Sequence, residues 1–426
     1  MLRKLRLLAA LLVLPVVALN AMGLTQALAA PAKQAGPQTF TVYMGHEIFT
    51  EAGEKSSWQA DRFYPESITI NAGDSIVWKH DAGVEPHTVT LTGPDNKFPD
   101  LALPPAGSPP RLEVNPMVLL PQGAAQYDGS AYVNSGIIAA DIPGPKEYKL
   151  TFTKPGTYRF FCAIHAGQAP DGSIGGMVGE VTVQEAGSAL PKTPEQVEAD
   201  AKAMMSADEQ AAAQAEPQAK QQAVTSKPGP NGTTIYHVNT GYQLPAGTMG
   251  AVLDYMRFSP EDIQINVGDT VEWSSPTPTN FHDVVFGEEP EAILIEPQPS
   301  GPPKGYLNPD AFMPVGGTTH TGTGVYGSGI INGPQGPPFP GAVTSYSLTF
   351  SQPGRYEYVC ALHYHNGMEG HVTVQAMTTG GGQPGMPRTG SPTEWLLALG
   401  SVAGALILLA GMALRVRRAR RFGKSL

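Results

Sequence analysis

Short stretches in which apolar and polar residues alternate recur along most of the chain, and turn-forming residues separate them. Ile68 and Ile70 alternate with polar residues, and Gly73-Asp74 turns the chain into the next apolar run. This alternation predicts half-buried strands joined by tight turns. The 49 glycines and 41 prolines, together with only 15% charged residues, suit many short strands. We therefore predict that the body of the chain is all-β.

The strand pattern of the first half of the chain returns in the second half at a nearly constant spacing. Trp78 corresponds to Trp273 at an offset of 195 residues, and Cys162 corresponds to Cys360 at an offset of 198. Small changes in a steady offset are typical of loops that vary around a shared framework, so the chain contains an internal duplication. The two domains that this duplication predicts span residues 37–185 and 229–376.

Between the repeats, residues 186–228 are rich in alanine and glutamine, which favours a helical linker over further strands. Thr193, Pro194 and Gln196 fit an N-cap, a proline at the first helical position and the glutamine of a capping box. The apolar stripe of this helix is thin, so we predict that it packs only lightly against the domains.

The first 29 residues, 1–29, have the three parts of a secretory signal peptide. Basic residues, an apolar run and the small-residue motif Ala27-Leu28-Ala29 follow one another, which predicts cleavage after Ala29. The alternative interpretation is an uncleaved membrane anchor. Both interpretations export the two domains.

The other end of the chain is expected to be anchored in a membrane. Residues 377–393 include a glycine-rich flexible tether, and residues 395–414 form an uncharged apolar run, a transmembrane helix long enough to cross a bilayer. The arginines of 415–426 place this tail in the cytoplasm. Within the tether, Met-Pro-Arg-Thr-Gly at 386–390 resembles a sortase sorting signal with methionine in place of leucine, which adds wall attachment as a hypothesis. We expect an exported, cell-surface protein with a single membrane pass.

The charge of the exported part argues against nucleic acid as a partner. The chain has 27 basic and 37 acidic residues, and nine of the basic residues lie in the signal segment and the C-terminal tail. The remaining 18 basic residues leave a net charge near −19. A strongly acidic protein repels nucleic acid and anionic lipid, and it favours a basic protein partner.

Cys162 and Cys360 are the two cysteines of the sequence, and two cysteines in an exported protein first suggest a disulfide. They occupy equivalent positions of the two repeats, however, and each stands three residues before a histidine. A disulfide would have to join the same interior position of two separate domains, with the two Cα atoms close together. A thiolate ligand in each domain is the better interpretation.

Each repeat carries four metal-binding side chains in the same order. A histidine stands upstream, a Cys-x-x-His motif follows, and a methionine precedes a Val-Thr-Val strand. These residues are His87, Cys162, His165 and Met177 in the first repeat, and His282, Cys360, His363 and Met368 in the second. Thiolate and thioether favour copper, whereas thioether is not among the usual ligands of zinc. Two histidines, one cysteine and a weak axial methionine are typical of blue-copper electron-transfer sites.

Both repeats resemble cupredoxins of the plastocyanin and auracyanin kind. The resemblance covers nearly all of both domains and rests on Gly-Asp-x-(Val/Ile)-x-Trp, the upstream histidine, Pro-Gly-x-Tyr-x-(Phe/Tyr)-x-Cys-x-x-His and Gly-Met-x-Gly-x-Val-x-Val. It implies two Greek-key β-sandwiches, each with a type 1 copper near one end. It also implies that the cysteine and both histidines of each repeat bind copper, with the methionine as the weak axial ligand.

The axial position of the first site has two candidates. Four residues separate His363 from Met368, which fits the family, but eleven separate His165 from Met177. Met177 keeps its place before the Val-Thr-Val strand, so we assign it as the axial ligand. Gln168 is the rival, because an amide oxygen also serves at this position. Since the axial ligand tunes the potential, we expect the two sites to differ.

Six further histidines show no repeated pattern: His46, His80, His237, His320, His365 and His371. Two of them, His365 and His371, flank the second ligand loop. We expect both to face the solvent.

We predict a carrier of single electrons rather than an enzyme. Multicopper oxidases and copper nitrite reductases are also built from cupredoxin domains, and they connect a type 1 copper to a second copper through a histidine beside the cysteine. Here phenylalanine, valine and alanine stand beside the two cysteines. The non-redox alternative is copper binding or trafficking, with the metal as cargo. For the electron carrier, the acidic surface suggests a redox partner protein such as a basic cytochrome.

Overall fold

The computed structural model describes residues 36–50, 55–104, 106, 111–168, 171–276, 281–287, 290, 293–333 and 339–376. The expected signal peptide and the expected tether, membrane span and basic tail lie outside these residues. Within the described part of the chain, no helix is both long enough and apolar enough to cross a membrane.

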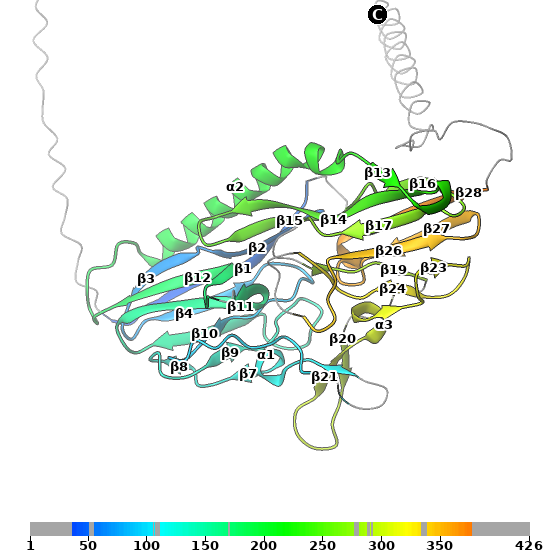
Figure 1. The fold of residues 1–426 in the computed structure, drawn as a ribbon. Helices are drawn as coiled ribbons and strands as arrows, with labels where there is room; N and C mark the ends of the chain where they lie inside the picture. Colours follow the sequence, from blue (N-terminus) through cyan, green and yellow to red (C-terminus); the bar gives the residue numbers. More distant parts are fainter. Residues whose placement is uncertain are drawn as a thin grey trace, which may run out of the picture.

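One large sheet runs through both repeats (Figure 1). Its strand order is β23 (Thr319–His320), β26 (Ser345–Phe350), β17 (Thr270–Ser274), β14 (Thr234–Ala246), β15 (Ala251–Ser259), β2 (Trp58–Tyr64), β1 (Thr39–Ile48), β4 (Ser75–His80), β10 (Glu147–Phe152) and β8 (Gln126–Tyr127), with β13 (Thr225–Pro228) paired to β14. The central neighbours β15 and β2 come from different repeats and pair antiparallel. The strand order on one side of this pair is therefore repeated in reverse on the other side.

Each repeat adds a six-stranded sheet with the same strand order. In the first repeat it is β3 (Ser67–Asn71), β12 (Ile174–Gln184), β11 (Gly156–Gln168), β5 (Thr90–Leu91), β9 (Val133–Ser135) and β7 (Pro121–Gln122). In the second repeat it is β16 (Asp262–Asn266), β28 (Glu369–Gln375), β27 (Gly354–Val359), β19 (Val285–Phe286), β24 (Tyr326–Ser328) and β22 (Pro314–Val315). The matching orders confirm the predicted duplication, and the fold is mostly β as predicted.

Two small sheets and a few helices complete the described structure. The sheets are β18 (Phe281–His282) with β25 (Ile331–Asn332), and β20 (Ile293–Glu296) with β21 (Lys304–Leu307) and β6 (Leu112–Glu113). The helices are α1 (Pro116–Leu119), α2 (Pro194–Lys220), α3 (Pro309–Phe312) and the 3-10 turns η1 (Pro230–Gly232) and η2 (Tyr364–Asn366). Thr193 and Gln196 form the predicted capping box at the start of α2.

Helix α2 is tied firmly to the sheet, so the prediction of light packing is wrong. It lies along β1, β2 and β15, and small buried alanines on this face let it approach closely (Figure 1). Nη1 of Arg62 donates to both oxygens of Asp208, at 3.0 and 2.8 Å, and the Tyr64 hydroxyl donates to the same carboxylate at 2.6 Å. Removing one member of such a buried pair typically costs about 3 to 5 kcal/mol. The helix is therefore held by the carboxylate of Asp208. The prediction of light packing considered only the apolar residues of the helix and did not include this carboxylate.

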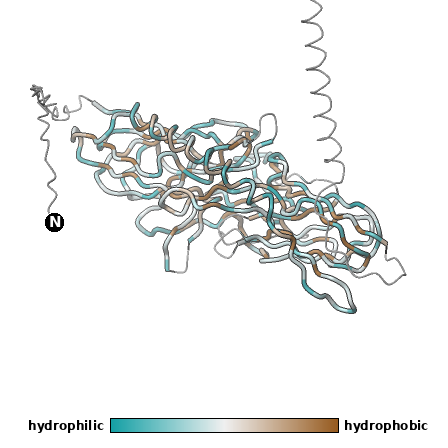
Figure 2. Tube along the Cα trace, turned by 90° about the horizontal axis from the view of Figure 1, so that it is seen from above, coloured by the Kyte–Doolittle hydropathy of each residue, from teal (hydrophilic) through white to brown (hydrophobic). Residues whose placement is uncertain are grey.

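Each domain has a tryptophan at the same place in its core. The ring centroids of Trp78 and Phe160 lie 5.3 Å apart, and those of Trp273 and Tyr358 also lie 5.3 Å apart, both in edge-to-face contact. All four rings are buried. Along the strands of both repeats, hydrophobic and hydrophilic segments follow one another in Figure 2. The sequence alternation thus gives each repeat an apolar core around its tryptophan.

The two repeats also meet away from the central sheet. Strand β21 of the second repeat pairs with β6 of the first, with Tyr306 opposite Glu113 and Leu307 opposite Leu112. Lys304 donates to Glu113 at 3.0 Å across this junction. Buried side chains of the second repeat belong to the same apolar cluster as the core of the first. Two sets of strand pairs and a shared apolar contact therefore join the domains.

Candidate metal centres

The hairpin of β11 and β12 holds three of the four predicted ligands of the first site. The ladder between the two strands breaks between Phe161 and Ala166, so Cys162 and His165 lie in a bulge. Both residues are buried. The upstream ligand candidate, His87, comes from a separate segment that forms a short bridge with Ile138. The bulge and the bridge bring Cys162 and His87, which are 75 positions apart in the sequence, next to each other.

Cys162, His87 and His165 form a closed triangle of possible ligand atoms. The Cys162 Sγ lies 3.7 Å from Nδ1 of His87 and 3.6 Å from Nδ1 of His165, and the two Nδ1 atoms are 3.1 Å apart. Burial, together with the neighbouring His165, holds the pKa of His87 well below its usual value. His87 is therefore a neutral imidazole, as a metal ligand must be.

The second repeat builds the same triangle from His282, Cys360 and His363. The Cys360 Sγ lies 4.0 Å from Nδ1 of His282 and 3.4 Å from Nδ1 of His363, and the Nδ1 atoms are 3.0 Å apart. Strand β18 holds His282, and His363 stands directly before η2. Burial holds the pKa of His282 well below its usual value, as it does at the equivalent residue of the first site.

The geometry of both triangles fits a single metal ion. Nitrogen and sulfur ligands lie about 2.0 to 2.3 Å from a bound ion, so ligands of one ion are separated by roughly 3 to 4 Å. Two ring nitrogens that face each other beside a sulfur, away from water, need a common partner. A soft cation would satisfy all three atoms, and this donor set suits copper.

The predicted axial methionines are both fully buried. Met177 belongs to the same apolar cluster as Cys162, and Met368 belongs to the same cluster as Cys360. The second loop is also fixed by its backbone, because the N–H of Cys360 donates to the Met368 carbonyl at 3.0 Å. Gly176 allows β12 to approach the bulge, since a Cβ there would lie 2.3 Å from the carbonyl oxygen of His165.

Gln168, the rival axial candidate, is occupied elsewhere. Its side-chain Nε2 donates to the carbonyls of Asn96 and Gly172, both at 3.2 Å, near the exposed end of the hairpin. Its side chain is only half-buried, whereas Met177 is inaccessible to solvent. The amide of Gln168 therefore holds a loop at the end of the hairpin, away from the buried position of Met177.

A glycine lies against the ring of each upstream histidine. Gly45 and Gly241 occupy irregularities in the pairing of β1 with β2 and of β14 with β15, and both have positive φ, 67° and 81°. A Cβ at Gly45 would lie 2.3 Å from Nε2 of His87, and one at Gly241 would lie 2.5 Å from Nε2 of His282. Each strand therefore supports a ligand ring through direct backbone contact.

The residue after each upstream histidine contacts the cysteine, and here the two sites differ. The backbone N–H of Thr88 donates to the Cys162 Sγ at 3.3 Å, and that of Asp283 donates to the Cys360 Sγ at 3.5 Å. The side chains of both residues accept a hydrogen bond from the residue after the cysteine, at 2.8 and 2.7 Å. Burial raises the pKa of Asp283 to about 7. The second site thus has a carboxyl group where the first has a hydroxyl.

The two centres meet at a single carboxylate. Glu85 is buried, and its Oε1 lies 3.0 Å from Nε2 of His165. Its Oε2 lies 3.7 Å from Nε2 of His363, the corresponding ligand candidate of the other domain. Burial tends to raise the pKa of Glu85, but His363 and His165 outweigh this effect and lower it. The outer nitrogens of both imidazoles therefore face the same anion.

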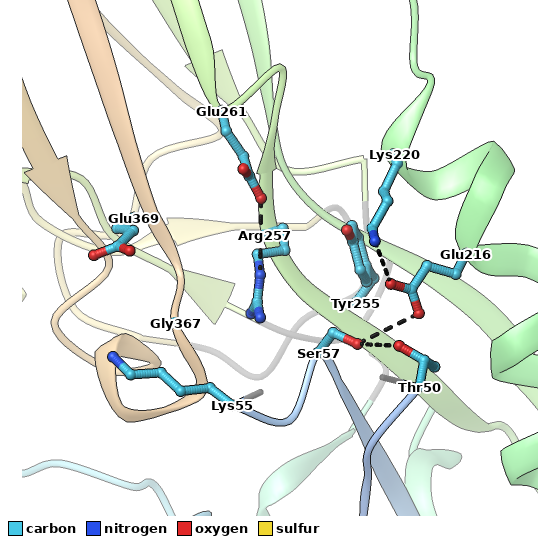
Figure 3. A pocket seen from close by; sticks show the side chains of 10 residues that line it. All are labelled: Thr50, Lys55, Ser57, Glu216, Lys220, Tyr255, Arg257, Glu261, Gly367 and Glu369. Atoms are coloured by element: carbon cyan, nitrogen blue, oxygen red, sulfur yellow. Dashed lines mark hydrogen bonds and ion pairs between the residues drawn. The ribbon is translucent and has the colours of Figure 1, made fainter. Parts of the chain in front are cut away.

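The first repeat also holds the ligand loop of the second. Nζ of Lys55 donates to the Tyr364 carbonyl at 3.3 Å, and the amide of Asn366 donates to the Ser56 hydroxyl at 3.0 Å. Beside this loop lies a cavity of about 380 Å³ that both repeats line with charged and polar side chains (Figure 3). The lining residues are Thr50, Lys55, Ser57, Glu216, Lys220, Tyr255, Arg257, Glu261, Gly367 and Glu369. The second centre therefore depends on the contact between the domains.

The other histidines lie outside the two triangles. His365 is exposed, as predicted, but His371 is half-buried and its Nδ1 lies 3.0 Å from Asp262. His46 lies between Asp81 and Glu209, and so contributes to holding α2 on the sheet. In the described ranges, the clusters of three or more histidine, cysteine or acidic side chains that could hold a metal ion are the two triangles.

Comparison with known proteins identifies the family. A family model described as copper binding proteins of the plastocyanin/azurin family matches residues 51–184 and 336–375. Plastocyanin of Rumex obtusifolius is 30% identical over 122 residues, which cover 29% of this chain and 87% of the plastocyanin. Plastocyanin A/B of Petroselinum crispum is 31% identical over 121 residues, covering 28% and 86%. The chain belongs to the plastocyanin/azurin family of copper-binding proteins.

Solved structures of related copper proteins cover about one domain of this chain. A reduced Cu(I) form of an amicyanin variant is 18% identical, covers 34% of this chain and 82% of the amicyanin, and has a TM-score of 0.18. A mutant fern plastocyanin is 16% identical, covers 33% of this chain and 99% of the plastocyanin, and also has a TM-score of 0.18.

Replacing Gly241 by alanine should weaken the second centre and leave the first intact. The added methyl group would lie 2.5 Å from Nε2 of His282, so the ring must move. Gly232 has the same φ of 81° with nothing within 4 Å of a Cβ, so Gly232→Ala carries the backbone cost alone. Copper affinity is measured at each site by competition with a chelator. Equal losses in the two variants would show that the contact with the ring is unimportant.

Proposed function

We propose that this chain is an extracytoplasmic type 1 copper protein that carries single electrons at two sites. Each copper, when bound, supplies one-electron chemistry by changing between Cu(II) and Cu(I). The observation that carries the proposal is the duplicated, buried triangle of one sulfur and two Nδ1 atoms, with a buried methionine in the neighbouring strand or directly before it.

The ligands that we assign are the eight residues of the sequence pattern. The three direct ligands are His87, Cys162 and His165 in the first site, and His282, Cys360 and His363 in the second. We assign Met177 and Met368 as the axial groups. The burial of Met177 and the occupied amide of Gln168 support this choice at the first site.

Burial favours electron transfer over the trafficking of copper as cargo. The six direct ligands are at most 4% exposed, and the contact between the domains covers the outer nitrogens of His165 and His363. Metal exchange would require these ligands to become accessible, whereas an electron can pass through packed protein. A rigid site also suits a reaction in which the ligands stay in place.

Copper counting tests the assignment directly. We expect two coppers per full chain and a strong visible absorption band towards the red, which arises from the thiolate. Cys162→Ser and Cys360→Ser should each leave one copper and about half of the band, and the double variant should leave neither. A band that keeps its full intensity in either single variant would rule out that thiolate as a ligand.

The two sites are expected to have different reduction potentials. The carboxyl group of Asp283 lies beside the thiolate of the second site, and Thr88 takes this position in the first. Above about pH 7, where the carboxyl group of Asp283 is ionised, its negative charge stabilises the oxidised metal more than the reduced metal. Asp283→Asn keeps an acceptor for the N–H of Ala361, so it should raise the potential of the second site alone. A redox titration in which both midpoints stay unchanged would contradict this account.

The proposed location and partner follow from the ends of the sequence and its charge. An exported, membrane-anchored carrier with a net charge near −19 would dock with a basic protein such as a cytochrome. On washed membranes, rising salt should slow electron exchange with a basic cytochrome, because salt screens the charges that guide docking. The protein itself should stay in the membrane fraction. Release by salt, or a rate that does not depend on salt, would count against the anchor or the docking, respectively.

A further inference from the structure

Glu85 belongs to the first repeat but contacts a ligand histidine of each domain. Its two carboxylate oxygens face Nε2 of His165 at 3.0 Å and Nε2 of His363 at 3.7 Å. The backbone around it is also fixed, because Nε2 of His80 contacts the Glu85 carbonyl at 2.8 Å. The side chain is therefore held in the contact between the domains and not in a flexible loop.

The duplication supplies this carboxylate only once. Glu85 stands two residues before His87, and the position two residues before His282 is Asn280 in the sequence. The antiparallel pairing of β2 with β15 sets Gln59 opposite Asp254, which is its own counterpart at an offset of 195. The repeats are thus related by an approximate two-fold axis through this pair. Such an axis lets a single side chain serve the ligands of both repeats.

Placing a carboxylate here has a cost that its neighbours must offset. A buried ion loses its solvation, and hydrogen bonds and opposite charges must replace the water. Asp61 is also buried, and its Oδ1 lies 4.0 Å from Nδ1 of His165, so its charge repels that of Glu85. The groups positioned to stabilise Glu85 are the two Nε2 atoms. An imidazole that uses Nδ1 for a metal carries its proton on Nε2 and can donate it here.

We propose that Glu85 is a positioning residue shared by both copper centres. It accepts the hydrogen bond from Nε2 of His165, attracts the N–H dipole of His363, and holds both rings with Nδ1 towards the cysteines. No proton or electron leaves the carboxylate in this role. This proposal rests on the proposed function, because it assumes that the two triangles bind copper. If Glu85 has this role, the copper centres of the two domains share one supporting carboxylate.

The shared role predicts that one substitution in the first domain weakens copper binding in both. Loss of a group that orients a metal-bound histidine typically lowers metal affinity about 10- to 100-fold. Full-chain Cys360→Ser reports the first site and Cys162→Ser reports the second, and Cu(I) affinity is measured by competition with a Cu(I) chelator. Adding Glu85→Gln should lower the affinity at least about tenfold in both backgrounds.

Glu66→Gln is the matched control. Glu66 is also a buried carboxylate of the first repeat that reaches the second, where the N–H of Thr248 donates to it at 2.9 Å. It takes no part in either triangle. The control should leave both affinities within about twofold, since Glu66 does not contact a ligand histidine and so does not orient one. A loss confined to the first site, or equal losses with Glu66→Gln, would overturn the proposal.

A second measurement uses the wild-type chain, so it does not depend on whether a variant folds. In the Cu(I)-loaded wild-type chain, nuclear magnetic resonance should show slowly exchanging Nε2 protons on both His165 and His363. A rapidly exchanging Nε2 proton on His363 would overturn the proposal. If copper still binds fully in the double cysteine variant, the proposed function fails instead. The two failures are distinguishable, because the first is observed in the Nε2 proton of His363 in a loaded chain and the second in copper binding by the double cysteine variant.

Discussion

The arrangement of this protein depends on the backbone pairing of β2 with β15. Four residue pairs join the repeats edge to edge, from Val252 opposite Asp61 to Tyr255 opposite Trp58. Because the pairing is antiparallel, it turns the second domain about an approximate two-fold axis with respect to the first. The ends of the two domains that carry the ligand triangles then face each other, and His165 and His363 approach the same carboxylate. A side-by-side arrangement of independent domains would separate His363 from Glu85, whereas His165 contacts Glu85 within its own repeat.

Close contact between the domains also explains the burial of the sites. A copper site that exchanges electrons with an external protein benefits from a short path through one of its ligands. Here the Nε2 atoms of His165 and His363, the histidines of the two Cys-x-x-His motifs, both face Glu85 at the contact between the domains. One protein path from each site therefore leads through Glu85 to the other site. The two centres differ in the group beside the thiolate, which is Thr88 in the first and Asp283 in the second.

Much of the fold and of each separate site follows from the sequence, because the information is local or repeated. The duplication predicts matching strand orders, and the two Cys-x-x-His motifs predict ligand triangles that the structure brings together. Glu85 could not be predicted, because its importance depends on how two domains pack, and only one repeat contains it. The close packing of α2 could not be predicted for a related reason, since Asp208 of this helix holds it in place only by its contact with Arg62 of strand β2. Thr88 and Asp283 could have been found from the sequence, because each directly follows the upstream histidine of its own repeat.

The central claim is that the two copper centres lie face to face across Glu85. Electron paramagnetic resonance of the fully oxidised full chain tests it most directly, because two nearby Cu(II) spins broaden or split each other's signals. The account predicts a clear dipolar interaction in the two-copper protein and its disappearance in both Cys162→Ser and Cys360→Ser. A spectrum of the two-copper protein that equals the sum of the two single-site spectra would contradict the account.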